Sequence, residues 1–182
     1  MMGGDGGSAP ALTPPSMPPP IPEVTALLTY LNRQRGHVLG ILEGLSEDAL
    51  RRPALPSGWS CLGLVHHLAL DVERFWFRAV VAGEREVIDG LDGDGWRVPA
   101  TMPAAAVFDL YRREIDRANA IITSTPLDTP PAWWPPDLIG DERIPDLRHV
   151  VLHTTTETAG HTGHLDAARE LMDGKLWLVL TG

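Results

Sequence analysis

The chain has 182 residues and a mass of 19.8 kDa, which suits one domain with a single core and excludes a disulfide-stapled miniprotein. Its 24 acidic and 15 basic side chains give a formal charge of -9, the opposite of the basic surface that nucleic-acid binding requires. The single cysteine, Cys61, excludes an internal disulfide and indicates a reducing compartment, and no apolar run is long enough to span a membrane. We therefore expect a cytoplasmic protein with no nucleic-acid partner and no membrane partner.

Residues 1–22 form a leader that we expect to be disordered. The segment holds seven prolines and four glycines, and it lacks the lysine or arginine that begins a signal peptide. Such a composition buries too little apolar surface to offset the entropy lost on ordering. We expect the rest of the chain, residues 23–182, to fold as a single domain.

Three long helices are predicted in the first two thirds of the folded part. Apolar residues recur at steps of three and four over residues 23–45, which indicates the first helix. The second runs from Ser60, a good N-cap, to about Ala82, and it is apolar almost all round, so we expect it to lie deep in the fold. The third begins at Pro103 and continues to about Thr123.

A long loop over residues 125–145 precedes the last helix. It contains six prolines and the adjacent Trp133 and Trp134, and two neighbouring tryptophans favour a packed lid. The last helix is predicted over residues 146–172, with an aspartate N-cap and Gly174 after its end. The sequence therefore predicts an all-α fold, an up-down-type four-helix bundle with a long Pro/Trp-rich loop before the last helix.

Histidines and a carboxylate gather on the second and last of these helices. Glu157 and His161 stand four residues apart, the spacing by which one helix offers two ligands to one ion. Either His66 or His67 on the second helix can supply a third ligand, which leaves open positions as in a catalytic metal site. The alternative is that these histidines are hydrogen-bonded core residues. At 100° per residue, four side chains share one face of the last helix: His153, Glu157, His161 and His164.

Other polar residues have two interpretations each. Cys61 at a helix N-terminus is either a reactive thiolate or, more commonly, a small buried hydrophobe. Arg74 and Arg78 either hold a ligand carboxylate or lie on the surface. Three residues that follow the last-helix histidines either support a site or form solvated ion pairs: Asp166, Arg169 and Glu170.

Two stretches of the chain carry a family resemblance. Residues 58–77 begin Gly-Trp-Ser-Cys-Leu-Gly-Leu-Val-His-His-Leu-Ala, and residues 153–174 begin His-Thr-Thr-Thr-Glu-Thr-Ala-Gly-His-Thr-Gly-His. Together they resemble the DinB-like metal-binding four-helix superfamily. More narrowly, the chain is similar to the branch of mycothiol-dependent transferases, relatives of mycothiol-dependent maleylpyruvate isomerase. The resemblance covers about residues 23–174.

The resemblance implies a ligand set and a reaction. The family's metal ligands fall on His67, Glu157 and His161, which selects His67 where spacing left His66 open. A divalent metal ion, zinc first, with nickel, manganese or iron as alternatives, would hold a mycothiol-like thiol as a metal-bound thiolate. That thiolate would attack a small electrophilic substrate, and His164 or His153 would move the proton.

Two further hypotheses stand beside this metal-dependent thiol S-transferase. The same ion could activate water, which would make the protein a metal-dependent hydrolase that turns over without added thiol. A third hypothesis is a non-catalytic metal-binding module for stress response or interaction, with a homodimer as one form. Coordination saturated by protein ligands, with His164 as the fourth, would indicate this third hypothesis.

Overall fold

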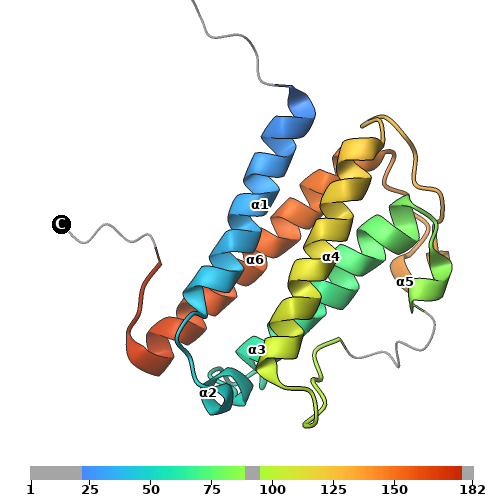
Figure 1. The fold of residues 1–182 in the computed structure, drawn as a ribbon. Helices are drawn as coiled ribbons and strands as arrows, with labels where there is room; N and C mark the ends of the chain where they lie inside the picture. Colours follow the sequence, from blue (N-terminus) through green and yellow to red (C-terminus); the bar gives the residue numbers. More distant parts are fainter. Residues whose placement is uncertain (1–21, 89–94, 178–182) are drawn as a thin grey trace, which may run out of the picture.

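The computed structural model describes residues 22–88 and 95–177, and within these two ranges all regular secondary structure is helical (Figure 1). This confirms the all-α prediction. The leader predicted at residues 1–22 lies outside the described residues, apart from Pro22. The elements in chain order are α1 (Glu23–Ile41), α2 (Glu47–Arg51), α3 (Cys61–His67), η1 (Leu68–Val81), η2 (Arg85–Ile88), α4 (Ala104–Ser124), α5 (Pro136–Ile139) and α6 (Leu147–Asp173).

The second predicted helix changes its hydrogen-bond pattern immediately after His67. Its first part, α3, is α-helical, and Ser60 Oγ accepts the Gly63 N–H at 3.0 Å, as expected of an N-cap. Its second part, η1, is a π-helix, and the Ala82 N–H that follows it donates to Phe77 O, five residues back. π-Helical turns are rare and often occur at functional sites.

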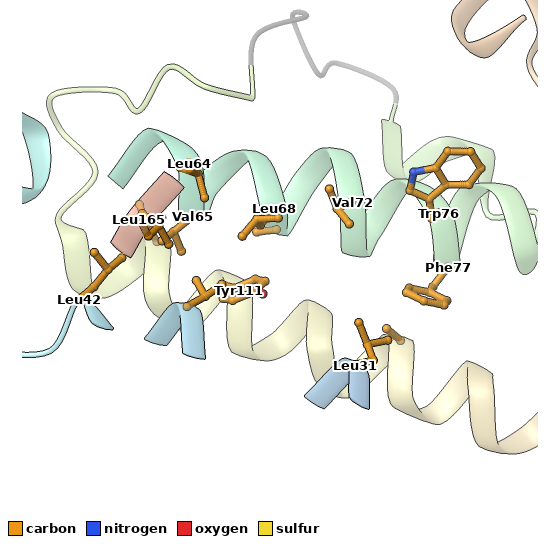
Figure 2. Packing of buried hydrophobic residues seen from close by; sticks show 14 of the residues in the cluster. Leu31, Leu42, Leu64, Val65, Leu68, Val72, Trp76, Phe77, Tyr111 and Leu165 are labelled. Carbon is orange, nitrogen blue, oxygen red and sulfur yellow. The ribbon is translucent and has the colours of Figure 1, made fainter. Parts of the chain in front are cut away.

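The longest helices pack around one core. α1 contacts α6 and α4, while η1 contacts α4 and α6 in turn. Figure 2 shows Leu68 and Phe77 on the side of α3 and η1 that faces Tyr111 of α4 and Leu31 of α1. These four side chains are fully buried, which confirms that the second predicted helix lies deep in the fold. Phe75, on the same helical stretch, is only partly buried.

An ion pair lies inside this apolar core. Arg35 of α1 donates through Nε to Glu73 Oε1 of η1 at 2.7 Å, and the two side chains are only 2% and 0% exposed. The same guanidinium donates at 2.8 Å to the amide oxygens of Asn32 and Asn119. A buried charge pair needs this full set of hydrogen bonds, because each charge has lost its hydration.

α6 begins and ends where the sequence indicates. Asp146 is its N-cap and accepts the His149 N–H at 3.0 Å, and Gly174 follows with φ 76°, a left-handed conformation that favours glycine. α4 also matches its predicted range, whereas the short helix α2 was not predicted. No helix within residues 22–88 and 95–177 is long and apolar enough to cross a membrane.

The Pro/Trp-rich loop is fastened to the end of η1. Trp133 N–H donates to Val80 O at 3.0 Å, and the Trp134 ring lies 6.1 Å from that of Trp76. Within the loop, Trp134 Nε1–H donates to Gly140 O at 2.8 Å. The loop is therefore packed, as expected, and its two tryptophans cover the later turns of η1.

Candidate metal centre

His67, Glu157 and His161 come together where α3 passes into η1 beside α6. One ligand atom from each side chain lies within 4.8 Å of the other two. His67 is the last residue of α3, and Glu157 and His161 stand one turn apart on α6, with His161 Nε2 3.1 Å from Glu157 Oε1. The structure thus gathers the same three residues that spacing and resemblance indicated.

The His67 ring is held from two sides. Its Nδ1 lies 2.8 Å from Asp71 Oδ2, and because an ionised carboxylate only accepts hydrogen bonds, Nδ1 carries the hydrogen. Trp96 stacks on the ring with a centroid distance of 4.3 Å and an interplanar angle of 15°. The second nitrogen, Nε2, is therefore left with a lone pair for a ligand.

The surroundings of His161 favour its neutral imidazole. Burial and the neighbouring His67 lower the pKa of His161 below its usual value, so its imidazole is uncharged at neutral pH, the form that binds metal. In the described part of the chain its buried Nδ1 has no hydrogen-bond partner. Glu157, in contrast, is 42% exposed, so the group opens to solvent on the Glu157 side.

This donor set fits a divalent ion. Two imidazoles and one carboxylate are a ligand set that zinc and iron(II) both accept. Three protein ligands leave coordination positions free for a further molecule, which is the pattern of a catalytic rather than a structural site.

His66 belongs to the core and not to this group. It is 7% exposed, and its Nδ1 donates to the backbone oxygen of Gly95 at 2.7 Å. The structure therefore makes the same selection of His67 over His66 as the family resemblance did, because the two adjacent residues point in different directions from the helix.

Comparison with known families supplies the decisive observation on identity. The family described as Mycothiol-S-transferase matches residues 26–174, from the first turn of α1 to the end of α6. The chain belongs to this mycothiol S-transferase family, which is DinB-like. A search of curated proteins found no match.

Within this mycothiol S-transferase fold, the two histidines considered for proton transfer have different surroundings. The His164 ring lies 5.7 Å from that of His161 and 6.1 Å from that of Trp59. The His153 ring packs at 4.5 Å on Trp76 of η1. Both side chains are exposed, but His164 is the one placed beside the three-residue group.

Of three weaker candidates, one is buried in the core and two have ion-pair partners. Cys61 is fully buried, and burial raises the pKa of its thiol to about 11, so the interpretation as a small buried hydrophobe holds. Arg74 and Arg78 both point to Glu114 of α4, with the shortest contact 2.7 Å from Arg74. Their guanidinium groups are thus used inside the fold.

The candidates near the end of α6 also lie away from the site. Asp166 Oδ1 accepts from His37 Nε2 of α1 at 2.7 Å. Arg169 is buried and donates to the Ile41 carbonyl at 2.6 Å. Glu170 is exposed. Asp166 and Arg169 thus hydrogen-bond toward α1 and the turn after it rather than to the three-residue group.

Sequence reasoning missed two residues that contact the candidate ligands. Asp71 stands four residues after His67, so helical spacing alone could have placed it within reach of that ring. Trp96, which contacts His67 and lies 5.5 Å from His161, lies in a turn outside the helices. No local pattern marks Trp96, because its position depends on where the chain returns to α3.

Proposed function

We propose that this chain is a divalent-metal-dependent transferase that joins a low-molecular-weight, mycothiol-like thiol to a small electrophile. One observation carries the proposal: His67, Glu157 and His161 offer three ligand atoms within 4.8 Å of one another, in a mycothiol S-transferase family member. A divalent ion bound there supplies the positive charge that lowers the pKa of a thiol and favours its thiolate at neutral pH.

The residues of the chain divide the remaining tasks. His67, oriented by Asp71, and His161, whose pKa is lowered, offer ring nitrogens to the ion, and the exposed side of Glu157 is where thiol and electrophile have room to enter. Trp96 stacks on the His67 ring and lies edge-on to that of His161, and we assign it to keeping water from these two rings. His164, next to His161, is the group we assign to proton transfer, in preference to His153.

The proposed reaction balances as a transfer of sulfur to carbon. The thiol loses its proton to His164, and the sulfur forms a bond to the electrophilic carbon with its electron pair. The proton then goes either to the leaving group or to the addition product. No oxidant or reductant is needed.

We also propose a helix arrangement, a metal ion, a role and a location for this protein. The four longest helical stretches, α1, α3 with η1, α4 and α6, suit an up-down four-helix arrangement within one domain at residues 23–182. Zinc is the first ion to test. A detoxification role and a cytoplasmic location complete the proposal, because a thiol cosubstrate must stay reduced to react.

The test is metal content and thiol-dependent turnover of untagged protein purified without chelator. We expect about one equivalent of metal in the wild type, and loss of both metal and turnover in Glu157→Ala. Glu170→Ala is the matched control, because this exposed glutamate stands on the same helix away from the group. Circular dichroism checks that both variants keep their helices.

Three results would contradict the proposal in different ways. Stoichiometric metal and full turnover in Glu157→Ala would remove this ligand set. Turnover without added thiol would indicate a hydrolase. Bound metal without any exchangeable water and without turnover would indicate the non-catalytic module.

A further inference from the structure

The contact made by one nitrogen of a histidine ring decides whether the other nitrogen carries the hydrogen. A neutral imidazole carries a single N–H, so a strong acceptor at Nδ1 leaves the lone pair on Nε2. At His67 that acceptor is Asp71, one turn further along the same helical stretch, at 2.8 Å. The Asp71 side chain is 39% exposed, so the apolar core does not require it there.

The space for this carboxylate depends on Gly95. A Cβ atom on Gly95 would overlap Asp71 Oδ2, so any larger residue would displace the carboxylate from its position. Gly63 is needed in the same way, because its Cβ would overlap the backbone oxygen of Trp96. These two close approaches let residues 95–96 lie directly on α3 and the start of η1.

Two further contacts hold residues 95–96 in this position. His66, buried and adjacent to His67, donates through Nδ1 to Gly95 O at 2.7 Å. Trp96 then stacks on His67 at 4.3 Å, which fixes the plane of the ring while Asp71 fixes its rotation. Trp96 and Asp71 together therefore restrain the ring of a candidate ligand in both respects.

We propose that Asp71 is the positioning residue of the metal centre: it accepts the Nδ1–H of His67 and so presents His67 Nε2 to the ion shared with Glu157 and His161. The inference rests on the proposed metal-dependent function. Carboxylates that accept from a metal-binding histidine raise its basicity and orient it, and their loss weakens metal binding 10–100-fold.

The chain offers a matched control. Asp166 accepts from His37 at 2.7 Å, is 35% exposed, and lies at the α1–α6 contact away from the three-residue group. Asp166→Ala thus removes a histidine–aspartate hydrogen bond of the same kind and exposure as Asp71→Ala does. Any effect common to both variants reports the loss of a hydrogen bond, and an effect confined to Asp71→Ala reports positioning.

The first measurement needs no metal. Long-range ¹⁵N spectra of histidine-labelled protein report which ring nitrogen carries the hydrogen, and His67→Ala identifies the His67 signals. We expect His67 to be the Nδ1–H tautomer in the metal-free wild type and in Asp166→Ala. In Asp71→Ala we expect the Nε2–H tautomer to appear.

The second measurement is Zn²⁺ affinity by competition with a chromophoric chelator. We expect Asp71→Ala to bind Zn²⁺ 10–100-fold more weakly, and Asp166→Ala to match the wild type. Asp71→Asn, which keeps an acceptor oxygen of the same size, should lose less affinity than Asp71→Ala. The Co²⁺ absorption spectrum of Asp71→Ala should also change, because the geometry at His67 is no longer fixed.

The outcomes separate the inference from the proposed function. Equal Zn²⁺ affinity in the wild type and Asp71→Ala would overturn the positioning role while leaving the metal function intact. An Nε2–H tautomer of His67 in the wild type would overturn it too. A wild type that binds no Zn²⁺, Ni²⁺, Mn²⁺ or Fe²⁺ would overturn the metal function, and the positioning role with it.

Discussion

Two histidines of this protein are held in nearly the same way, yet only one lies at a candidate metal centre. His67 contacts Asp71 at 2.8 Å and stacks on Trp96 at 4.3 Å and 15°. His37 contacts Asp166 at 2.7 Å and stacks on Trp177 at 5.0 Å and 18°. Their side chains are 14% and 17% exposed.

A glycine permits the close packing in each case. Gly95 leaves room for the Asp71 carboxylate, and Gly40 leaves room for the Trp177 ring. The two histidine–aspartate pairs differ in which helices their hydrogen bonds join. Asp166 belongs to another helix than His37, so that pair fastens α1 to α6.

Asp71 lies in the same continuous helical stretch as His67, so it orients the ring and leaves one nitrogen directed elsewhere. A histidine, an aspartate and a tryptophan therefore do not identify a site by themselves. The groups near the remaining nitrogen do.

The largest expected effect is on the free energy of unfolding, because the core ion pair is more deeply buried than the two histidine–aspartate pairs. Both histidine pairs are partly exposed, whereas Arg35 and Glu73 are 2% and 0% exposed. Glu73→Gln leaves a buried guanidinium without its counter-charge, which costs about 3–5 kcal/mol of unfolding free energy. Urea unfolding measures it, with Asp166→Ala expected to cost much less. A loss in Glu73→Gln no larger than in Asp166→Ala would contradict this ranking.

The second-largest expected effect is the difference in Zn²⁺ affinity between His67→Ala and His37→Ala. His67→Ala removes a proposed ligand, so we expect Zn²⁺ affinity to fall by more than about 100-fold, beyond the effect of losing an outer hydrogen-bond partner. His37→Ala should leave affinity unchanged, because His37 lies at the α1–α6 contact. Isothermal titration of both variants measures the difference, and equal affinities would remove the basis for assigning His67 to the centre.

The two glycines should give a smaller separation. In Gly95→Ala the added methyl group displaces the Asp71 carboxylate, so we expect Zn²⁺ affinity to fall by about 10-fold, the lower end of the range for this kind of partner. In Gly40→Ala the methyl group displaces Trp177 instead and should leave affinity as in the wild type. Chelator competition compares the two, and an equal loss in both would indicate a general structural effect.

Tryptophan fluorescence should show the smallest effect. Trp96 touches both candidate histidine ligands, whereas Trp177 touches His37. Bound Co²⁺ should quench only part of the emission, because the chain has 6 tryptophans. The quench should be smaller in Trp96→Phe, where Trp59 near His164 still reports the ion, and unchanged in Trp177→Phe. An undiminished quench in Trp96→Phe would place the ion elsewhere.

Helical periodicity predicted the long helices of this protein well, because it depends on neighbouring residues alone. The boundaries of α4 and α6 follow from Pro103, Asp146 and Gly174, each a residue with a strong local preference. The π-helical stretch after His67 and the ion pair between Arg35 and Glu73 were not predicted. Both depend on how α3 and η1 pack against other helices, which no local pattern records.

The sequence by itself determined that Glu157 and His161 share one helix face, since their four-residue spacing fixes this in any α-helix. It also indicated two candidates for a third ligand, His66 and His67, on another helix. Only the tertiary structure decided that His66 turns to Gly95 and His67 to Glu157 and His161. The physical reason is that a ring's direction depends on its partners, and these come from distant parts of the chain.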